Sequence, residues 1–248
     1  MTRLIVTEFI KLRTIRSTWM LLGIQQAVVI ASLGVLVVVG ADLRAPTAVR
    51  QFLSQAAFMS SLFSLVLGIL AVAGEYRHRT ITDAYLTTPR RGRVIAAKLV
   101  ALTGISAMLG VLSALTALSV TAVVMNIRDA SFNLSSVETW RGVVGVIAGN
   151  ALYAAIGVSV GALIRNPTGA IAAALLWITL AEGIMASLLR DLSQWLPNAS
   201  LLALDYSPGR MASDSQLLPQ WGGALVLAAY AAAFALLALA TSVRRDVT

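Results

Sequence analysis

The sequence predicts an all-α integral membrane protein with six transmembrane helices. Hydrophobic residues make up 58% of the chain and charged residues only 12%, whereas soluble domains carry about 25% charged residues. The apolar residues come in runs of roughly 20, the length that a helix needs to cross a hydrocarbon core of about 30 Å. These runs lack the alternation of apolar and polar residues that marks a transmembrane β-barrel. Helical spans are therefore expected.

Six segments are free or nearly free of charged residues. We predict one transmembrane helix for each of them, within a single domain over residues 1–248: 19–40, 52–73, 99–125, 142–164, 168–188 and 221–243. The third segment is longer than a bilayer requires, so we expect it to tilt or to extend beyond the lipid.

The distribution of basic residues predicts the orientation. Of the 19 lysines and arginines, 13 lie before the first span, between the second and third, between the fourth and fifth, or after the sixth. By the positive-inside rule these segments and both termini are cytoplasmic. The net charge of +8 then belongs to a face that suits anionic membrane lipids, and no nucleic-acid partner is expected. We expect the plasma membrane of a bacterial cell.

Charged and apolar residues alternate in residues 1–17, and Ile5, Phe9 and Leu12 share one face of a helix. This pattern predicts an amphipathic helix that lies in the cytoplasmic membrane interface. The alternative is a solvated, positively charged flank of the first span.

A polar, basic insert separates the second and third spans. Glu75 closes the second span, Thr80 suits the N-cap of a helix with Asp83 as its acidic capping partner, and Pro89 ends that helix. The apolar and aromatic side of this helix at 80–88 consists of Ile81, Ala84, Tyr85 and Thr88. Two turns are not stable alone in water, so the helix must pack on the membrane or in a partner's groove. An ordinary interfacial connector is the alternative.

The same insert carries a resemblance to a known family. Its residues are Gly74-Glu75-Tyr76-Arg77-x-Arg79-Thr80-Ile81, then Leu86-x-Thr88-Pro89-x-Arg91-x-Arg93, then Lys98. In this place between spans two and three of six, the stretch resembles the membrane permease subunits of type-2 ATP-binding-cassette (ABC) exporters. The amphipathic start, the six spans and the long last external segment extend the resemblance over essentially the whole chain.

The resemblance implies a dimer of permeases, homomeric or heteromeric, that rests on two copies of a separate ABC ATPase subunit. Residues 80–88 would be the coupling helix that sits in a cleft of the ATPase. The expected coupling residues are Glu75, Arg79, Thr80, Ile81, Asp83, Ala84, Tyr85, Leu86, Pro89 and Arg91.

The sequence also indicates which catalytic and metal-binding motifs this chain lacks. It has no Gly-x-x-x-x-Gly-Lys-Ser/Thr phosphate loop, so ATP and Mg are expected on the partner subunit. With no cysteine and one histidine, His78, no metal site is expected in this chain. No arrangement of catalytic residues is apparent either, which disfavours an intramembrane enzyme.

The fourth span carries small residues at every fourth position. Gly145, Gly149, Gly157 and Gly161, with Tyr153 between them, form one stripe along the helix. Small residues let helix backbones approach closely, which is a main source of attraction between helices in lipid. We therefore assign the four glycines to helix packing.

Glu182 is the acidic residue within a predicted span. A charge there is costly, so we expect it either to bind a cationic substrate or gate a pathway, or to be a hydrogen-bonded structural carboxyl. Gln25, Asn150 and Trp195 are the other candidates for a substrate pathway. Interhelical hydrogen bonds for Gln25 and Asn150, and a place in an interfacial aromatic belt for Trp195, are the alternatives.

Residues 189–220 contain three prolines and several apolar patches. This composition is too apolar for a solvated loop. The resemblance implies a re-entrant segment over 188–204 that caps the exit path, with a break at Pro197-Asn198.

The function expected from the resemblance is ATP-driven export of an amphipathic or lipid-like substrate, a drug or a peptide. One alternative is an ATP-independent secondary transporter or channel. That class favours several intramembrane titratable residues or interrupted helices, and only Glu182 is present. Another alternative is a non-transporting immunity or sensing membrane subunit on the same fold.

Overall fold

Helices form all the regular secondary structure in the residues that the computed structural model describes, which are 2–14, 16–40, 42, 45, 47–77, 91–129, 134–205 and 217–244. Six helical segments in this part of the chain are long and apolar enough to cross a membrane. They are Thr18–Val38, Ala48–Arg77, Gly92–Ile127, Val137–Ile164, Pro167–Leu188 and Gln220–Thr241. The expectation of a helical protein with six helices long and apolar enough to cross a membrane is confirmed for the described residues.

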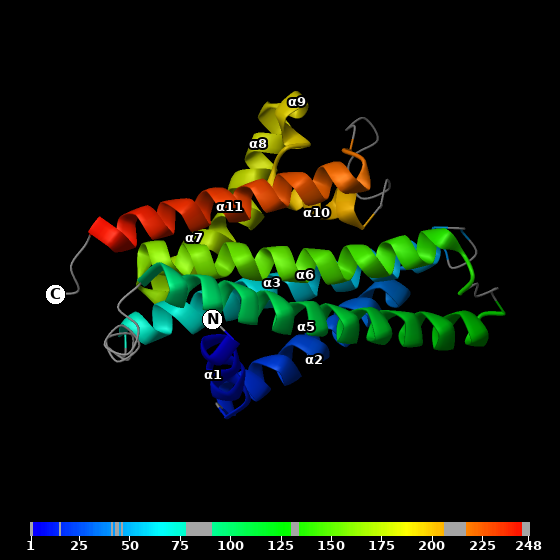
Figure 1. Cartoon of the computed structure of the whole chain (residues 1–248). Helices are drawn as coiled ribbons and strands as arrows, with labels where there is room; N and C mark the ends of the chain where they lie inside the picture. The colour runs from blue at the N-terminus through cyan, green and yellow to red at the C-terminus, as the bar shows by residue number, and fades with distance from the viewer. Residues whose placement is uncertain are drawn as a thin grey trace.

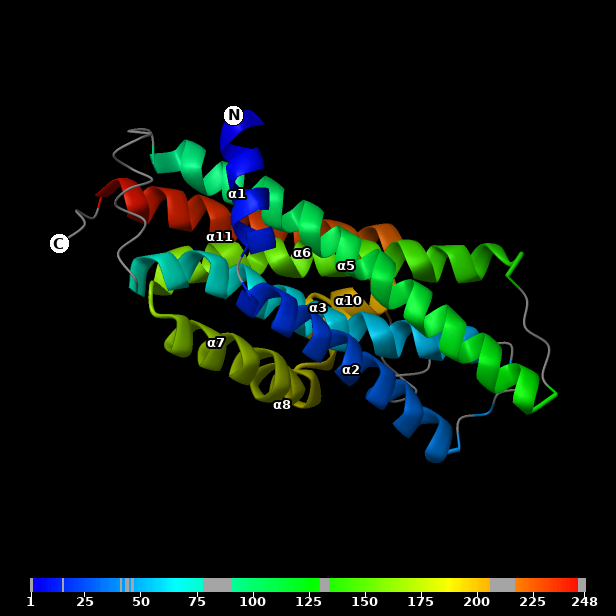
Figure 2. The same ribbon diagram turned by 90° about the horizontal axis from the view of Figure 1, so that it is seen from below.

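The helices follow the chain in the order shown in Figure 1. They are α1 Thr2–Thr14, α2 Arg16–Val38, α3 Ala48–Arg77, α5 Arg91–Ile127, α6 Val137–Ile164, α7 Pro167–Leu176, the π-helical turn η1 Trp177–Ala181, α8 Glu182–Leu188, α9 Arg190–Ser193, α10 Pro197–Leu204 and α11 Gln220–Arg244. Helix α6 is central, since α3, α5 and α11 all pack along it. Helix α1 runs across the direction of the long helices (Figure 2).

The long helices extend further than the apolar runs. Helix α3 continues to Arg77 and α5 begins at Arg91, whereas the predicted spans end at 73 and begin at 99. Charged residues end a hydropathy run, but a helix continues as long as its backbone hydrogen bonds are made. The ends of α3, α6 and α11 and the start of α5 gather at one end of the bundle (Figure 1). The basic flanks of these helices therefore lie together.

The glycine stripe of α6 is where its backbone meets α3 and α10. A Cβ atom at Gly157 would lie 2.2 Å from the carbonyl oxygen of Leu65, and one at Gly161 would lie 2.8 Å from that of Ile69. A Cβ at Gly145 would lie 2.4 Å from the carbonyl oxygen of Leu204, and one at Gly149 would meet the Leu201 side chain at 2.5 Å. Side chains at these positions would force the helices apart.

Two short helices, α9 and α10, lie between the fifth and sixth spans. The interruption between them covers 194–196, and Pro197 is the first residue of α10. The expected break at Pro197-Asn198 is thus displaced, because proline fits the first turn of a helix, where no backbone donor is needed. Helix α10 is buried along its length. It packs on α11 and α6.

Candidate functional site

Four charged side chains meet at the end of the bundle from which the insert leaves. The Lys98 Nζ donates to Glu75 Oε1 at 2.7 Å and to Glu8 Oε2 at 2.8 Å. Lys11 also pairs with Glu75. We call Glu8, Lys11, Glu75 and Lys98 the charged cluster. The Lys98 side chain is 1% exposed and that of Glu75 is 9% exposed, whereas that of Lys11 is 41% exposed, so the centre of the network is buried and its Lys11 edge is accessible.

The charged cluster joins three helices that are distant in sequence. Glu8 and Lys11 come from α1, Glu75 from the end of α3 and Lys98 from the second turn of α5. Buried charges are costly unless each is paired and hydrogen-bonded, and here two carboxylates meet two ammonium groups. The cluster therefore fixes the position of α1 against the two helix ends that flank residues 78–90.

A cation–π contact between Arg165 and Tyr76 lies at the same end of the bundle. The guanidinium carbon of Arg165 lies 5.0 Å from the centre of the Tyr76 ring, a cation–π distance. Arg165 is the left-handed C-cap residue of α6, with φ of 56°. The end of α6 is thus joined to the end of α3 beside the charged cluster.

Most of the predicted coupling residues lie outside the described residues. They are Arg79, Thr80, Ile81, Asp83, Ala84, Tyr85, Leu86 and Pro89, together with the expected helix over 80–88. Arg91 is the first residue of α5. Glu75 belongs to the charged cluster, at the base of the insert.

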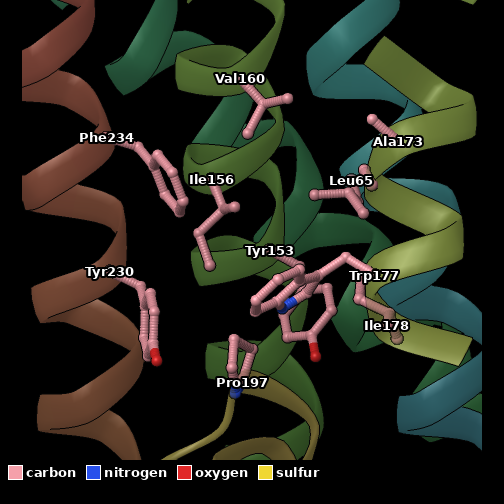
Figure 3. Close-up of a pocket in the computed structure, with 11 residues that line it drawn as sticks. Leu65, Tyr153, Ile156, Val160, Ala173, Trp177, Ile178, Pro197, Tyr230 and Phe234 are labelled. Carbon is pink, nitrogen blue, oxygen red and sulfur yellow. The ribbon is translucent and has the colours of Figure 1, made fainter. Parts of the chain in front are cut away.

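A cavity of about 230 Å³ lies between α3, α6, α7 with η1, and α11. Figure 3 shows four aromatic rings facing it, from Tyr153, Trp177, Tyr230 and Phe234. The remaining lining residues are Leu65, Ile156, Val160, Ala173, Ala174, Ile178 and Pro197. Trp177 lines the cavity and is nevertheless 46% exposed, so the cavity reaches the apolar outer face of the bundle beside α7 and η1.

Glu182 does not line this cavity, but its hydrogen-bond partner Asn198 follows the lining residue Pro197. The fifth span changes to a π-helical turn at Trp177–Ala181, and the backbone N–H of Glu182 donates to the carbonyl oxygen of Trp177. The Glu182 side chain is buried, and its Oε2 accepts from the backbone N–H of Asn198 at 2.7 Å. Because α10 has no side-chain cap of its own, Glu182 serves as the acceptor for its first turn. This contact holds α10 against the fifth span.

The other pathway candidates lie elsewhere in the structure. Asn150 accepts from Ser64 at 2.7 Å and donates to Ser60 at 2.8 Å, which joins α6 to α3. Gln25 donates to Ser113 at 3.2 Å, which joins α2 to α5. Trp195 is half exposed between α9 and α10. None of Gln25, Asn150 and Trp195 lines the cavity.

Two groups of residues carry too little signal in the sequence to be identified from it. Glu8 and Lys11 carry no local signal beyond charge in an amphipathic segment, and only the packing of α1 brings them to Lys98. Tyr230 and Phe234 are ordinary apolar residues of the sixth span until the fold sets them opposite Trp177. A spacing of four places them on one helical face, which is a weak signal in an apolar helix.

No group of three or more potential metal ligands occurs among the described residues. The described residues thus offer an ionic network at one end and an apolar, aromatic cavity in the interior, and the buried carboxyls of Glu182 and Asp205 lie outside the lining of that cavity. Comparison with known protein families and with curated proteins found no match to this chain.

Proposed function

We propose that this chain is the permease subunit of an ATP-driven exporter and that a separate ATPase subunit moves it by acting on residues 78–90. The charged cluster carries the proposal. It supports the idea because it ties both ends of the insert, Glu75 and Lys98, to each other and to α1. A force on the insert would then displace three helices together.

The proposed cycle follows from this arrangement. Two permeases, identical or related, form the pathway, and each rests on one ATPase that holds ATP and Mg. Closure of the ATPases biases the permeases between two arrangements of packed helices. The aromatic cavity supports an amphipathic or lipid-like cargo, a drug or a peptide, since its walls are apolar.

The experiment is a detergent pull-down of the tagged chain from its own cells, with ATP hydrolysis measured in the eluate. The double variant Tyr85→Arg/Leu86→Asp places charges on the expected contact face of the insert. We expect the wild type to retain an ATPase and the double variant to lose it. The matched control is Val137→Asp, a change at a 67% exposed residue at the opposite end of the bundle.

Equal ATPase recovery with Tyr85→Arg/Leu86→Asp and with Val137→Asp would contradict the proposed contact between the ATPase and the insert. A folded wild-type chain that recovers no ATPase would overturn the exporter itself.

One observation favours the second candidate, an ATP-independent transporter or channel. The fifth span changes to a π-helical turn directly before the buried Glu182. Such turns often occur at functional sites, and ATP-independent transporters place irregular helices and titratable groups at their binding sites. The pull-down separates the two, because this class recruits no ATPase.

A further inference from the structure

We propose that the cavity between α3, α6, α7 with η1, and α11 holds one hydrocarbon chain of a membrane lipid, which enters sideways from the bilayer. The headgroup of that lipid stays outside the protein. The use of the lipid as cargo rests on the proposed transport function, whereas the binding itself needs no ATPase.

The cavity lies about halfway along the spans that line it. Tyr230 is about 15 Å along α11 from its first residue, Gln220, at the rise of a helix of 1.5 Å per residue. Leu65 likewise lies in the middle part of α3, Ala48–Arg77. In a bilayer with a hydrocarbon core of about 30 Å, this depth holds lipid chains and neither headgroups nor water. The molecules that meet the cavity at this depth are therefore lipid chains.

The cavity extends in the direction of the helices. Its lining residues on α6 fall within 153–160, which corresponds to about 10 Å of helix. Figure 3 shows Tyr230 and Phe234 along one side of it and Trp177 along the other. Transmembrane helices tilt on average only about 20° from the bilayer normal. A space that extends along them therefore has nearly the direction of a lipid chain.

The walls favour hydrocarbon over water or a charged ligand. Every lining side chain is aliphatic or aromatic, and none carries a charge at neutral pH. Water needs two to four polar partners, and an empty apolar space loses the dispersion contacts that a chain would supply. The volume of about 230 Å³ is below the roughly 300 Å³ at which drug-sized pockets begin. The cavity therefore holds part of one chain and not a whole lipid.

The cavity opens on an apolar face of the fifth span. Trp177 is 46% exposed although it lines the cavity, and the lining residue Ala173, one turn earlier, is also exposed. Leu176 and Leu180 are exposed beside them. Ile156, in contrast, is buried and forms part of the inner wall. A lipid chain that enters past Trp177 thus meets no polar barrier.

The test is photocrosslinking of the purified chain in lipid nanodiscs, with no ATPase present. The probe is a phosphatidylcholine with a diazirine near the end of one acyl chain, and mass spectrometry of peptides maps the crosslinks. We expect labels at Ile156 and Tyr153, which are only 8% and 1% exposed. Leu236 on α11 is 67% exposed and reports ordinary contact with lipid. A second probe, with the diazirine on the headgroup, should label neither Ile156 nor Tyr153.

A variant that fills the cavity completes the test. Ala174→Phe should remove the labels at Ile156 and Tyr153, while the label at Leu236 remains. The matched control is Ala172→Phe, because Ala172 is exposed on the same helix and does not line the cavity. This control should keep all three labels.

Three results would overturn the proposal: no label at Ile156 and Tyr153 in the wild type, equal labelling of them by the headgroup probe, or labels that survive Ala174→Phe. The two probes on the wild type decide the question even where Ala174→Phe fails to fold. A pull-down without an ATPase would leave the crosslinks intact, and missing crosslinks would leave ATPase recovery intact. The failures of the two proposals are therefore distinguishable.

Discussion

At the scale of residues, the charged cluster places two carboxylates and two amines at the end of an apolar bundle. Lys98 is the centre of it, with Glu8 and Glu75 both within 2.8 Å of its Nζ. Pairing offsets the cost of burying these charges, but the offset is lost when one member is removed. Removing one charged member of the cluster should therefore destabilise the protein more than removing one acidic and one basic member together.

Lys98→Met should lower the free energy of unfolding by about 3–5 kcal/mol, the usual effect of leaving a buried charge without its partner. Chemical denaturation in detergent, followed by far-ultraviolet circular dichroism, measures it. Glu138→Gln removes the ion pair between Glu138 and Arg50. The Glu138 side chain is 54% exposed, so this change should lower the free energy of unfolding by less than about 1 kcal/mol.

Adding Glu8→Gln to Lys98→Met should recover part of the lost stability, because Lys98 is the ion-pair partner of Glu8, whereas Glu75 keeps its pair with Lys11. A Lys98→Met protein as stable as Glu138→Gln would show that the cluster is solvated rather than buried.

At the scale of elements, the sequence was sufficient for the existence of the six spans and insufficient for their ends. Apolar runs identify what lies in lipid, but α3 and α5 continue through Arg77 and from Arg91. The π-helical turn at Trp177–Ala181 had no signal, because a one-residue insertion leaves an apolar helix apolar. The partners of Glu8 and Glu182 depend on contacts across 90 and 16 residues, which local patterns do not encode.

Gly157→Ala should destabilise the bundle by about 1–3 kcal/mol, as overpacking does. Its Cβ would meet the Leu65 carbonyl at 2.2 Å, and backbone cannot yield as a side chain can. Gly34→Ala is the matched control, since nothing lies within 4 Å of its added Cβ, and alanine favours a helix over glycine. Thermal denaturation of the two variants side by side measures the difference. Equal melting temperatures would mean that α3 and α6 are not in close contact.

At the scale of the whole molecule, the apolar surface and the gathered basic ends fit a protein with one orientation in a membrane. Exposed large hydrophobic residues occur on α2, α5, α7, α8 and α11 among others, as contact with lipid requires. Both termini in the cytoplasm remain the prediction of the charge pattern.

Single-cysteine variants test this orientation cleanly, since the chain has no cysteine of its own. Leu134→Cys lies between α5 and α6, and Arg77→Cys lies at the end of α3. With a membrane-impermeant maleimide on intact cells, Leu134→Cys should label and Arg77→Cys should label only after lysis. The reverse pattern would invert the topology and place the insert outside the cell.

ATP hydrolysis in the eluate of the tagged wild-type chain is the measurement that decides whether a separate ATPase drives this chain through the insert. We predict an ATPase that elutes with the chain and disappears with Tyr85→Arg/Leu86→Asp but not with Val137→Asp. An eluate of folded wild-type chain without ATP hydrolysis would contradict it and favour an ATP-independent transporter.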